Sequence, residues 1–311
     1  MIILIKKSIT RRIIIATLSL FVLLIVYHFP SKKDKVVNEN DINYIEVEGQ
    51  PIFFIDSNNL VARTKIVLKK ELNQVDKAKS IIDSLIINSK NKDYIPSGFK
   101  AIIPENTRVI DLTIEDDLLK VNFTKDLLTV NELVEEKMLE SIIYSLTELD
   151  NIKRIMIFVE GNNLLELPNS RKKLPVILTR DYGINKVVDL DKIKETTKTV
   201  IYYVAKNGDN YYNIPVTLIN NDNKEKIEII IDELKSNSVS EPNLISYLTA
   251  SSELEDYEIL ENQIKLSFNK YLLDDLHNSN ILEEVKYSLA LSIKDNYGID
   301  SLSIIVDNNE I

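Results

Sequence analysis

The sequence predicts an α+β fold made of two tandem two-layer α/β sandwich modules, each with a mixed or antiparallel sheet covered by two helices. A unit of hairpin, helix and strand at residues 101–161 recurs in weaker form about 145 residues later. In both halves, runs typical of strands alternate with amphipathic helical runs, the pattern of helices packed on a sheet. A chain of 311 residues also has the length of about two domains.

The duplication is visible in the hairpin itself. Aligning residues 112–128 with residues 257–273 gives six identities in 17 positions, four of them apolar at strand or helix-entry spacing. The identical pairs are Ile114/Ile259, Lys120/Lys265, Phe123/Phe268, Lys125/Lys270, Leu127/Leu272 and Leu128/Leu273. Self-similarity at a fixed interval is the signature of a repeated structural unit, so we expect a duplicated module.

The first 50 residues predict a membrane attachment. Residues 1–12 form a basic leader with Lys6, Lys7, Arg11 and Arg12, which should remain in the cytoplasm. Residues 13–29 carry no formal charge over 17 positions, which predicts a transmembrane anchor at the short end of the usual span. Residues 30–50 are polar and charged and predict a linker. The domains that follow are therefore expected outside the cytoplasm.

A cleaved signal peptide is the alternative for this segment. Its apolar region is usually about 7–15 residues long and ends at a small-x-small site. Here the apolar run is longer and ends in Tyr27, His28, Phe29 and Pro30. The chain has no cysteine, so a lipid cannot be attached through one. We therefore expect an uncleaved anchor.

The first module, residues 51–164, is predicted to begin with two strands and a helix. Asn73 is a plausible N-cap for that helix, and Asp76 is favourably placed in its first turn. The further elements expected are a short strand at 101–103, a hairpin at 109–114 and 118–123, a helix at 131–149 and a strand at 152–159.

A connector at residues 165–199 separates the modules and contains the basic cluster Arg171, Lys172 and Lys173. Its length indicates that it wraps a module. The second module, residues 200–311, is predicted to begin with a hairpin at 200–219 and a helix at 224–234. The repeated hairpin follows, then a helix capped by Asn280 with Glu283 three residues later, and a final strand to Val306.

Composition excludes several classes of function. Without cysteine the chain can have no disulfide, thiolate zinc site or cysteine nucleophile. Seven of the 38 basic and one of the 48 acidic residues lie up to Lys35, which leaves 31 basic and 47 acidic residues after it, a net charge of −16. So acidic a body is repelled by nucleic acid, and we expect no nucleic-acid partner. The sequence also has no Walker loop and no G-x-G-x-x-G, so we expect no nucleotide cofactor.

The two histidines give no convincing site. His28 ends the apolar segment, where a polar tip at the membrane interface is expected. His277 has Asp274 and Asp275 nearby, but a zinc site usually needs three or four ligands, so a solvated turn is expected instead. A Ser-His-Asp triad would need one of these histidines, and neither lies near a nucleophile motif.

Paired carboxylates leave one enzymatic alternative open, because a glycosidase needs only two. The adjacent acids Glu115, Asp116 and Asp117 are predicted at a hairpin tip, and Glu160 precedes Gly161. Nothing in the sequence indicates the burial that would raise a pKa for acid catalysis. We therefore assign no catalytic, cofactor-binding or metal-binding residue.

Four tyrosines, Tyr202, Tyr203, Tyr211 and Tyr212, lie across the hairpin of the second module. Strand alternation would bury one of each pair and expose the other. Cross-strand aromatic packing is the simpler explanation, and a patch for protein contact is the alternative.

Several motifs resemble the GerMN domain of the sporulation and spore germination GerM family. They are the run at 103–107, the strand end at 121–125 and the Val-Glu-Gly at 159–161. The connector is similar to the stretch between paired GerMN domains, at Leu174-Pro175, at 178–180 and at 183–185. With the repeat, the resemblance covers residues 50–310. In the second module, residues 248–252 replace the family's Pro-Glu loop.

The resemblance implies modules similar to the ring-building motifs of secretion and sporulation channels. It also implies a non-enzymatic, membrane-anchored extracytoplasmic scaffold in a sporulation or germination envelope complex. The expected partners are envelope or sporulation-complex proteins, further copies of the chain, the membrane through residues 13–29, and peptidoglycan. The alternatives are a peptidoglycan hydrolase using paired carboxylates and an accessory to a membrane sensor kinase.

Overall fold

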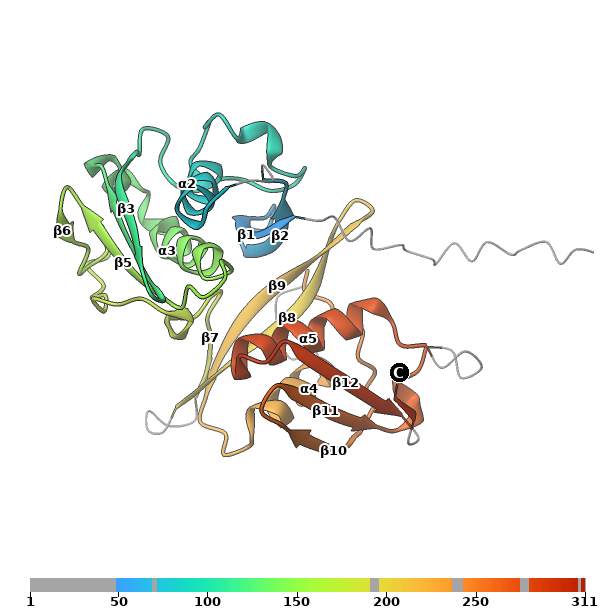
Figure 1. Ribbon diagram of the computed structural model, residues 1–311. Coiled ribbons are helices and arrows are strands. Elements are labelled where there is room, and N and C mark those ends of the chain that lie inside the picture. Colours follow the sequence, from blue (N-terminus) through green and yellow to red (C-terminus); the bar gives the residue numbers. More distant parts are fainter. Residues whose placement is uncertain are drawn as a thin grey trace, which may run out of the picture. The chain divides into compact units, whose positions relative to one another are not determined.

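The duplicated unit is present as two four-stranded sheets of the same topology (Figure 1). The computed structural model describes residues 49–68, 72–190, 196–236, 243–274 and 280–306, and the backbone of 309–310. The predicted leader and anchor, nearly all of the linker, and His28, Asp275 and His277 lie outside the described residues. Within the described chain, no helix combines the length and the apolar character that a membrane crossing requires.

The two sheets agree strand by strand. In each, the first pair of strands is antiparallel, the second parallel and the third antiparallel. The irregularity in the first pair also recurs, between Val109 and Asp111 and between Leu254 and Asp256. The first sheet contains β3 (Val109–Glu115), β4 (Leu118–Phe123), β5 (Arg154–Val159) and β6 (Asn162–Asn163); the second contains β10 (Leu254–Ile259), β11 (Gln263–Phe268), β12 (Ser301–Val306) and β13 (Asn309–Glu310). The duplication predicted from six identities is therefore confirmed.

Each module has two helices, as predicted: α2 (Gln74–Leu85) and α3 (Glu132–Leu146), then α4 (Lys226–Ser236) and α5 (Glu283–Tyr297). The Asn73 side chain accepts from the Asp76 N–H and caps α2, which confirms that prediction. Asn280 as the cap of α5 was wrong, because Leu282 occupies the cap position and makes no side-chain capping bond. A strand at 101–103 was also wrong, since Ile103 forms only an isolated bridge with Ile86.

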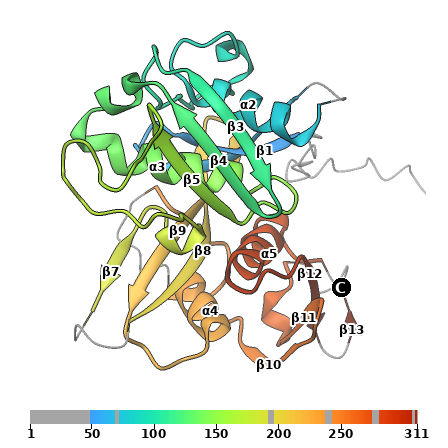
Figure 2. The ribbon, with the colours of Figure 1, turned by 60° about the vertical axis from the view of Figure 1, so that its left-hand side comes forward.

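The opening hairpins do not join their modules' own four-stranded sheets. These hairpins are β1 (Gln50–Ile55) with β2 (Val61–Ile66) and β8 (Thr197–Asn207) with β9 (Asn210–Asn220). Strand β2 pairs with β9 at Arg63 and Asn213, and β7 (Val187–Asp189) runs parallel to β9, so both modules share one five-stranded sheet. Helix α3 consequently lies between the sheet of β3–β5 and the β1–β2 hairpin (Figures 1 and 2). The predicted two-layer module is therefore incomplete, because the helix layer is covered on both sides.

Buried serines explain how a strand edge can lie against a helix. The Phe53 N–H in β1 donates to Ser145 Oγ at 2.9 Å, and the Tyr202 N–H in β8 donates to Ser292 Oγ at 2.9 Å. Ser141 Oγ donates to the Phe53 carbonyl, and Ser292 Oγ to the Ser288 carbonyl at 2.6 Å. Small side chains allow the close approach, and their hydroxyls serve backbone groups that no strand pairs with. The Ser-x-x-x-Ser pattern is thus a structural part of the repeat.

Replacing Ser145 or Ser292 by alanine tests this role. Each change leaves a buried backbone N–H unpaired, so we expect the free energy of unfolding to fall by about 1–3 kcal/mol. Urea denaturation measures it. The control is Ser236→Ala at the exposed end of α4, which should stay within about 0.5 kcal/mol of wild type. Two buried variants as stable as this control would contradict the role.

Candidate functional site

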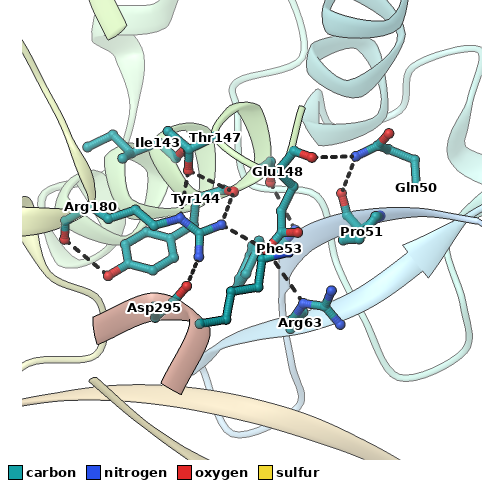
Figure 3. A network of polar contacts seen from close by, with 12 residues as sticks. Gln50, Pro51, Phe53, Arg63, Ile143, Tyr144, Thr147, Glu148, Arg180 and Asp295 are labelled. Carbon is teal, nitrogen blue, oxygen red and sulfur yellow. Dashed lines mark hydrogen bonds and ion pairs between the residues drawn. The ribbon is translucent and has the colours of Figure 1, made fainter. Parts of the chain in front are cut away.

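A half-buried arginine of the connector, with 20% of its side chain exposed, joins the two modules. Arg180 begins η3 (Arg180–Tyr182), and its guanidinium contacts one acid from each module (Figure 3). Nη2 donates to Glu148 Oε1 at 2.8 Å, and Nη1 pairs with Asp295 Oδ1. Nε donates to Thr147 Oγ1 at 2.9 Å. Only 5% of the Glu148 side chain and 2% of the Asp295 side chain are exposed, so these ion pairs are shielded from water.

The two acids occupy equivalent positions in the repeat. Glu148 lies three residues after Ser145, and Asp295 lies three residues after Ser292. Each serine accepts a hydrogen bond from the edge strand of its own module. The junction therefore brings equivalent acids of the two modules to one arginine, and Arg63 adds a second cation 3.6 Å from Glu148.

Aromatic rings complete the surroundings of Arg180. Its guanidinium carbon lies 4.9 Å from the centroid of the Tyr144 ring and 5.9 Å from that of Phe53, distances typical of cation–π contacts. The Tyr144 hydroxyl donates to the Arg180 carbonyl at 3.2 Å. The Tyr202 hydroxyl donates to Asp295 Oδ2 at 2.8 Å. Arg180, the two acids and the hydroxyl groups of Tyr144 and Tyr202 therefore form one connected polar cluster.

The ionisation of the two acids is shifted in opposite directions. Burial alone would raise the pKa of Glu148, but Arg180 and then Arg63 lower that pKa below its ordinary value. Burial raises the pKa of Asp295, and the charge of Arg180 opposes this rise. Burial also raises the pKa of Tyr202, so its phenol stays protonated and can donate to Asp295. The acids act here as counterions of Arg180.

A second connection, through Asn185, closes the gap between β2 and β9. Its Oδ1 accepts from the Val61 N–H at 2.9 Å, and its Nδ2 donates to the Val61 and Pro215 carbonyls at 2.7 and 2.8 Å. Proline has no N–H to donate to a neighbouring strand, so the amide replaces ladder bonds that Pro215 cannot make. The Asn185 N–H in turn donates to Glu140 Oε2 of α3 at 3.0 Å. The connector thus binds the shared sheet and the helix of module 1.

Two of the carboxylates considered from sequence are held in ion pairs. Glu115 pairs with Lys120 at 2.7 Å, and Asp117 pairs with Arg154. Asp116 has a φ of 54° within the turn. Glu160 Oε1 accepts from the Lys125 N–H at 3.0 Å.

A groove of about 770 Å³ does lie at the junction. Acids line it, but Asp117, Glu148, Asp295 and Asp300 are each paired with an arginine or lysine. In the described part of the chain, no three histidine, aspartate or glutamate side chains are arranged to hold a metal.

The comparisons with known proteins agree with this architecture. The sequence model of the family described as "Germane: Sporulation and spore germination" matches residues 51–165. The spore germination protein GerM of Bacillus subtilis (strain 168) is 25% identical over 262 residues, which cover 82% of this chain and 70% of GerM. The solved tandem GerMN domains of the sporulation protein GerM from Bacillus subtilis match with a TM-score of 0.76 and 24% identity, over 84% of this chain and 91% of theirs. Residues 51–165 thus match the family model, and most of the chain is similar in sequence and in fold to the tandem GerMN domains of GerM.

The burial of the four tyrosines differs from the expectation. Tyr202, Tyr203 and Tyr212 are buried, and Tyr211 is half-buried. Both faces of the β8–β9 hairpin are covered, so strand alternation does not expose one residue of each pair. The Tyr212 hydroxyl donates to Asp56 at 2.9 Å, and its ring packs edge-on against Phe99 at 4.9 Å. Three of the four therefore pack inside the protein.

The junction residues were not recognised from the sequence. Arg180 and Asn185 do lie in the connector motifs at 178–180 and 183–185 that carry the family resemblance. These motifs were the available signal, because a recognisable sequence motif in a long connector without regular structure indicates that its residues are packed against the modules. Glu148 and Asp295 gave no signal of their own, since an acid near a helix end is common on surfaces.

Replacing Arg180 by methionine should strongly destabilise the unit formed by the two modules. Asp295 would remain buried without its cation, and Glu148 would keep only Arg63, at 3.6 Å, so we expect a loss of about 3–5 kcal/mol in the free energy of unfolding. Urea denaturation measures it. The control is Arg171→Met, whose guanidinium is exposed and pairs with Glu166 at the surface, and which should leave stability nearly unchanged. Equal effects of the two substitutions would show that the cluster contributes little.

The lowered pKa of Glu148 predicts a pH dependence. The pairing of ionised Glu148 stabilises the fold above its unfolded pKa of about 4.3, and this contribution is lost as the pH falls through the lower, folded pKa. The stability difference between wild type and Glu148→Gln should therefore shrink between neutral pH and about pH 3. The control Glu105→Gln, at an exposed position, should give a small difference at every pH. A difference for Glu148→Gln that grows with acidification would contradict the assignment.

Proposed function

We propose that this chain is a non-enzymatic, membrane-anchored extracytoplasmic scaffold of a sporulation or germination envelope complex. The observation that carries the proposal is the junction, where Arg180 pairs with equivalent acids from the two modules. Residues 47–311 form one compact unit. A unit whose modules are held by buried ion pairs and a shared sheet presents its outer surfaces at fixed spacing, which is what a scaffold needs. The likeness to GerM, described as a spore germination protein, supports the sporulation context.

The anchor rests on residues 13–29. A basic leader followed by 17 uncharged residues fits a signal anchor that leaves the GerMN modules outside the cytoplasm. Tethering also confines copies to a surface, which raises their effective concentration for partners and for one another. Weak contacts can then suffice for assembly.

A peptidoglycan hydrolase is the second candidate, because two acids of the junction groove lack a cationic partner among the described residues. They are Asp150 and Asp181, and both line the groove of about 770 Å³. Their neighbours in the groove argue against catalysis, since Arg154, Arg180 and Lys294 already neutralise other acids there. An accessory role beside a membrane sensor kinase would use the same scaffold properties with a different partner.

Localisation tests the scaffold in cells. A tagged full-length copy followed through starvation should gather at the forming septum or the engulfing membrane and fractionate with membranes. Deletion of residues 1–29 should abolish both, because the attachment is lost. The tagged Arg171→Met variant serves as a full-length control and should behave as wild type.

Uniform distribution around the cell throughout starvation would contradict a sporulation role. Release of muropeptides from purified cell wall by the full-length chain, abolished by Asp150→Asn or Asp181→Asn, would replace the scaffold by the hydrolase. No release by the wild type, with correct localisation, is the result we expect.

A further inference from the structure

The edge strands of the modules differ in whether other parts of the chain cover their unpaired backbone groups. Buried serines and backbone bridges cover the outer edges of β1 and β8. Strand β10 ends its sheet and pairs only with β11 among the described residues. An open strand edge offers unpaired N–H and C=O groups to another extended chain.

The register shows which β10 groups point outward. The Leu260 N–H donates to the Gln263 carbonyl at 2.9 Å, which fixes the alternation of bonded and non-bonded pairs along the hairpin. The Tyr257–Leu266 and Ile259–Ile264 pairs are then non-bonded. The N–H and C=O of Tyr257 and Ile259 therefore face away from β11. The Tyr257 N–H is held locally by Asp256 Oδ1 at 2.9 Å.

A groove of about 550 Å³ runs beside this edge, between β10 and α4. Ile231, Leu254 and Tyr257 supply its apolar surface. In module 1 the corresponding helix, α2, packs against β3. A groove between an exposed strand edge and a helix is the arrangement in which domains accept an added strand.

The groove is acidic. Four carboxylates that line it, Glu228, Glu253, Glu255 and Asp256, have no cationic partner in the described part of the chain. Lys224 is occupied by Asp232 at 2.8 Å. Lys235 is the remaining base of the lining. An incoming strand that carries lysine or arginine would thus meet complementary charge along its length.

We propose that the groove between α4 and β10 binds an extended, lysine- or arginine-rich segment of a partner protein, which adds to β10 as a strand. The proposal rests on the scaffold function and names its docking site and the chemistry of the partner. The incoming strand pairs with the outward groups of Ile259 and Tyr257, and Asp256 releases the Tyr257 N–H as it does so. A second copy of this chain fits less well, because β10 or β3 of that copy would bring more acids to an acidic edge.

Peptide binding to the full-length chain in non-ionic detergent tests the site. The probe is a fluorescein-labelled peptide of alternating lysine and valine, and the control probe replaces lysine by glutamate. We expect saturable binding of the first peptide only, with slower hydrogen exchange at the Ile259 amide. Both follow from strand addition to an acidic edge.

Two variants separate strand addition from simple charge attraction. Ile259→Pro removes an outward N–H without breaking a bond to β11 and should abolish binding. Glu228→Lys with Glu255→Lys should weaken binding by about tenfold or more. The matched control reverses two exposed acids of module 1, Glu105→Lys with Asp111→Lys, and should bind as wild type.

Each other outcome overturns the proposal. Absence of binding does so, and binding that Ile259→Pro leaves intact shows attraction by charge alone. A wild-type dimer that Ile259→Pro dissolves shows that a second copy occupies the edge. Failure of the groove is distinguishable from failure of the scaffold, because a charge-reversed chain that localises normally leaves the scaffold standing. If the chain binds the peptide but never localises, the proposed binding groove stands and the proposed scaffold function is contradicted.

Discussion

The architecture depends on the ion pairs that half-buried Arg180 makes with two buried carboxylates, one from each module. Placing Arg180 in the interior alone would be costly, since desolvation of a charge exceeds what a single ion pair returns unless further hydrogen bonds are made. Here Glu148, Asp295 and Thr147 all accept from the guanidinium, and the rings of Tyr144 and Phe53 flank it. The arrangement is stable only when α3, the connector and α5 are all in place. Each module therefore helps to complete the interior of the other.

The shared sheet makes the same point for the backbone. An edge strand beside a helix would leave polar groups unpaired, and Ser145 and Ser292 supply the missing partners. Across the sheet, β2 and β9 meet at the pair Arg63–Asn213, and the Asn185 amide extends the connection past Pro215. Side chains thus continue a hydrogen-bond pattern that the strands alone cannot. The connector acts as part of the shared interior.

The local sequence pattern predicted most helices and strands correctly, but it did not predict which residues far apart in the sequence contact one another. The hairpin at 109–123 and helices α2 and α3 follow from apolar periodicity and from caps such as Asn73, which are properties of neighbouring residues. Pairing of β2 with β9 joins strands about 150 residues apart through one register position, which no local pattern encodes. Arg180 and Asp295 are 115 residues apart. The predicted order of layers was wrong for the same reason, because α3 is covered on its second side by the β1–β2 hairpin, which lies about 70 residues before it in the sequence.

The two modules share their interior residues at equivalent positions but differ in their outer surfaces. The inner positions are retained as a pair, with Ser145 matching Ser292 and Glu148 matching Asp295. The positions that bind the connector differ, since Glu140 of α3 receives Asn185 and Lys186 while Tyr287 stands at the matching place in α5. The connector binds to module 1, where helix α2 packs against β3. In module 2 a groove lies between α4 and β10 instead. Matched interior residues hold both modules in the same fold, whereas their outer surfaces differ, and the groove lies beside β10 of module 2.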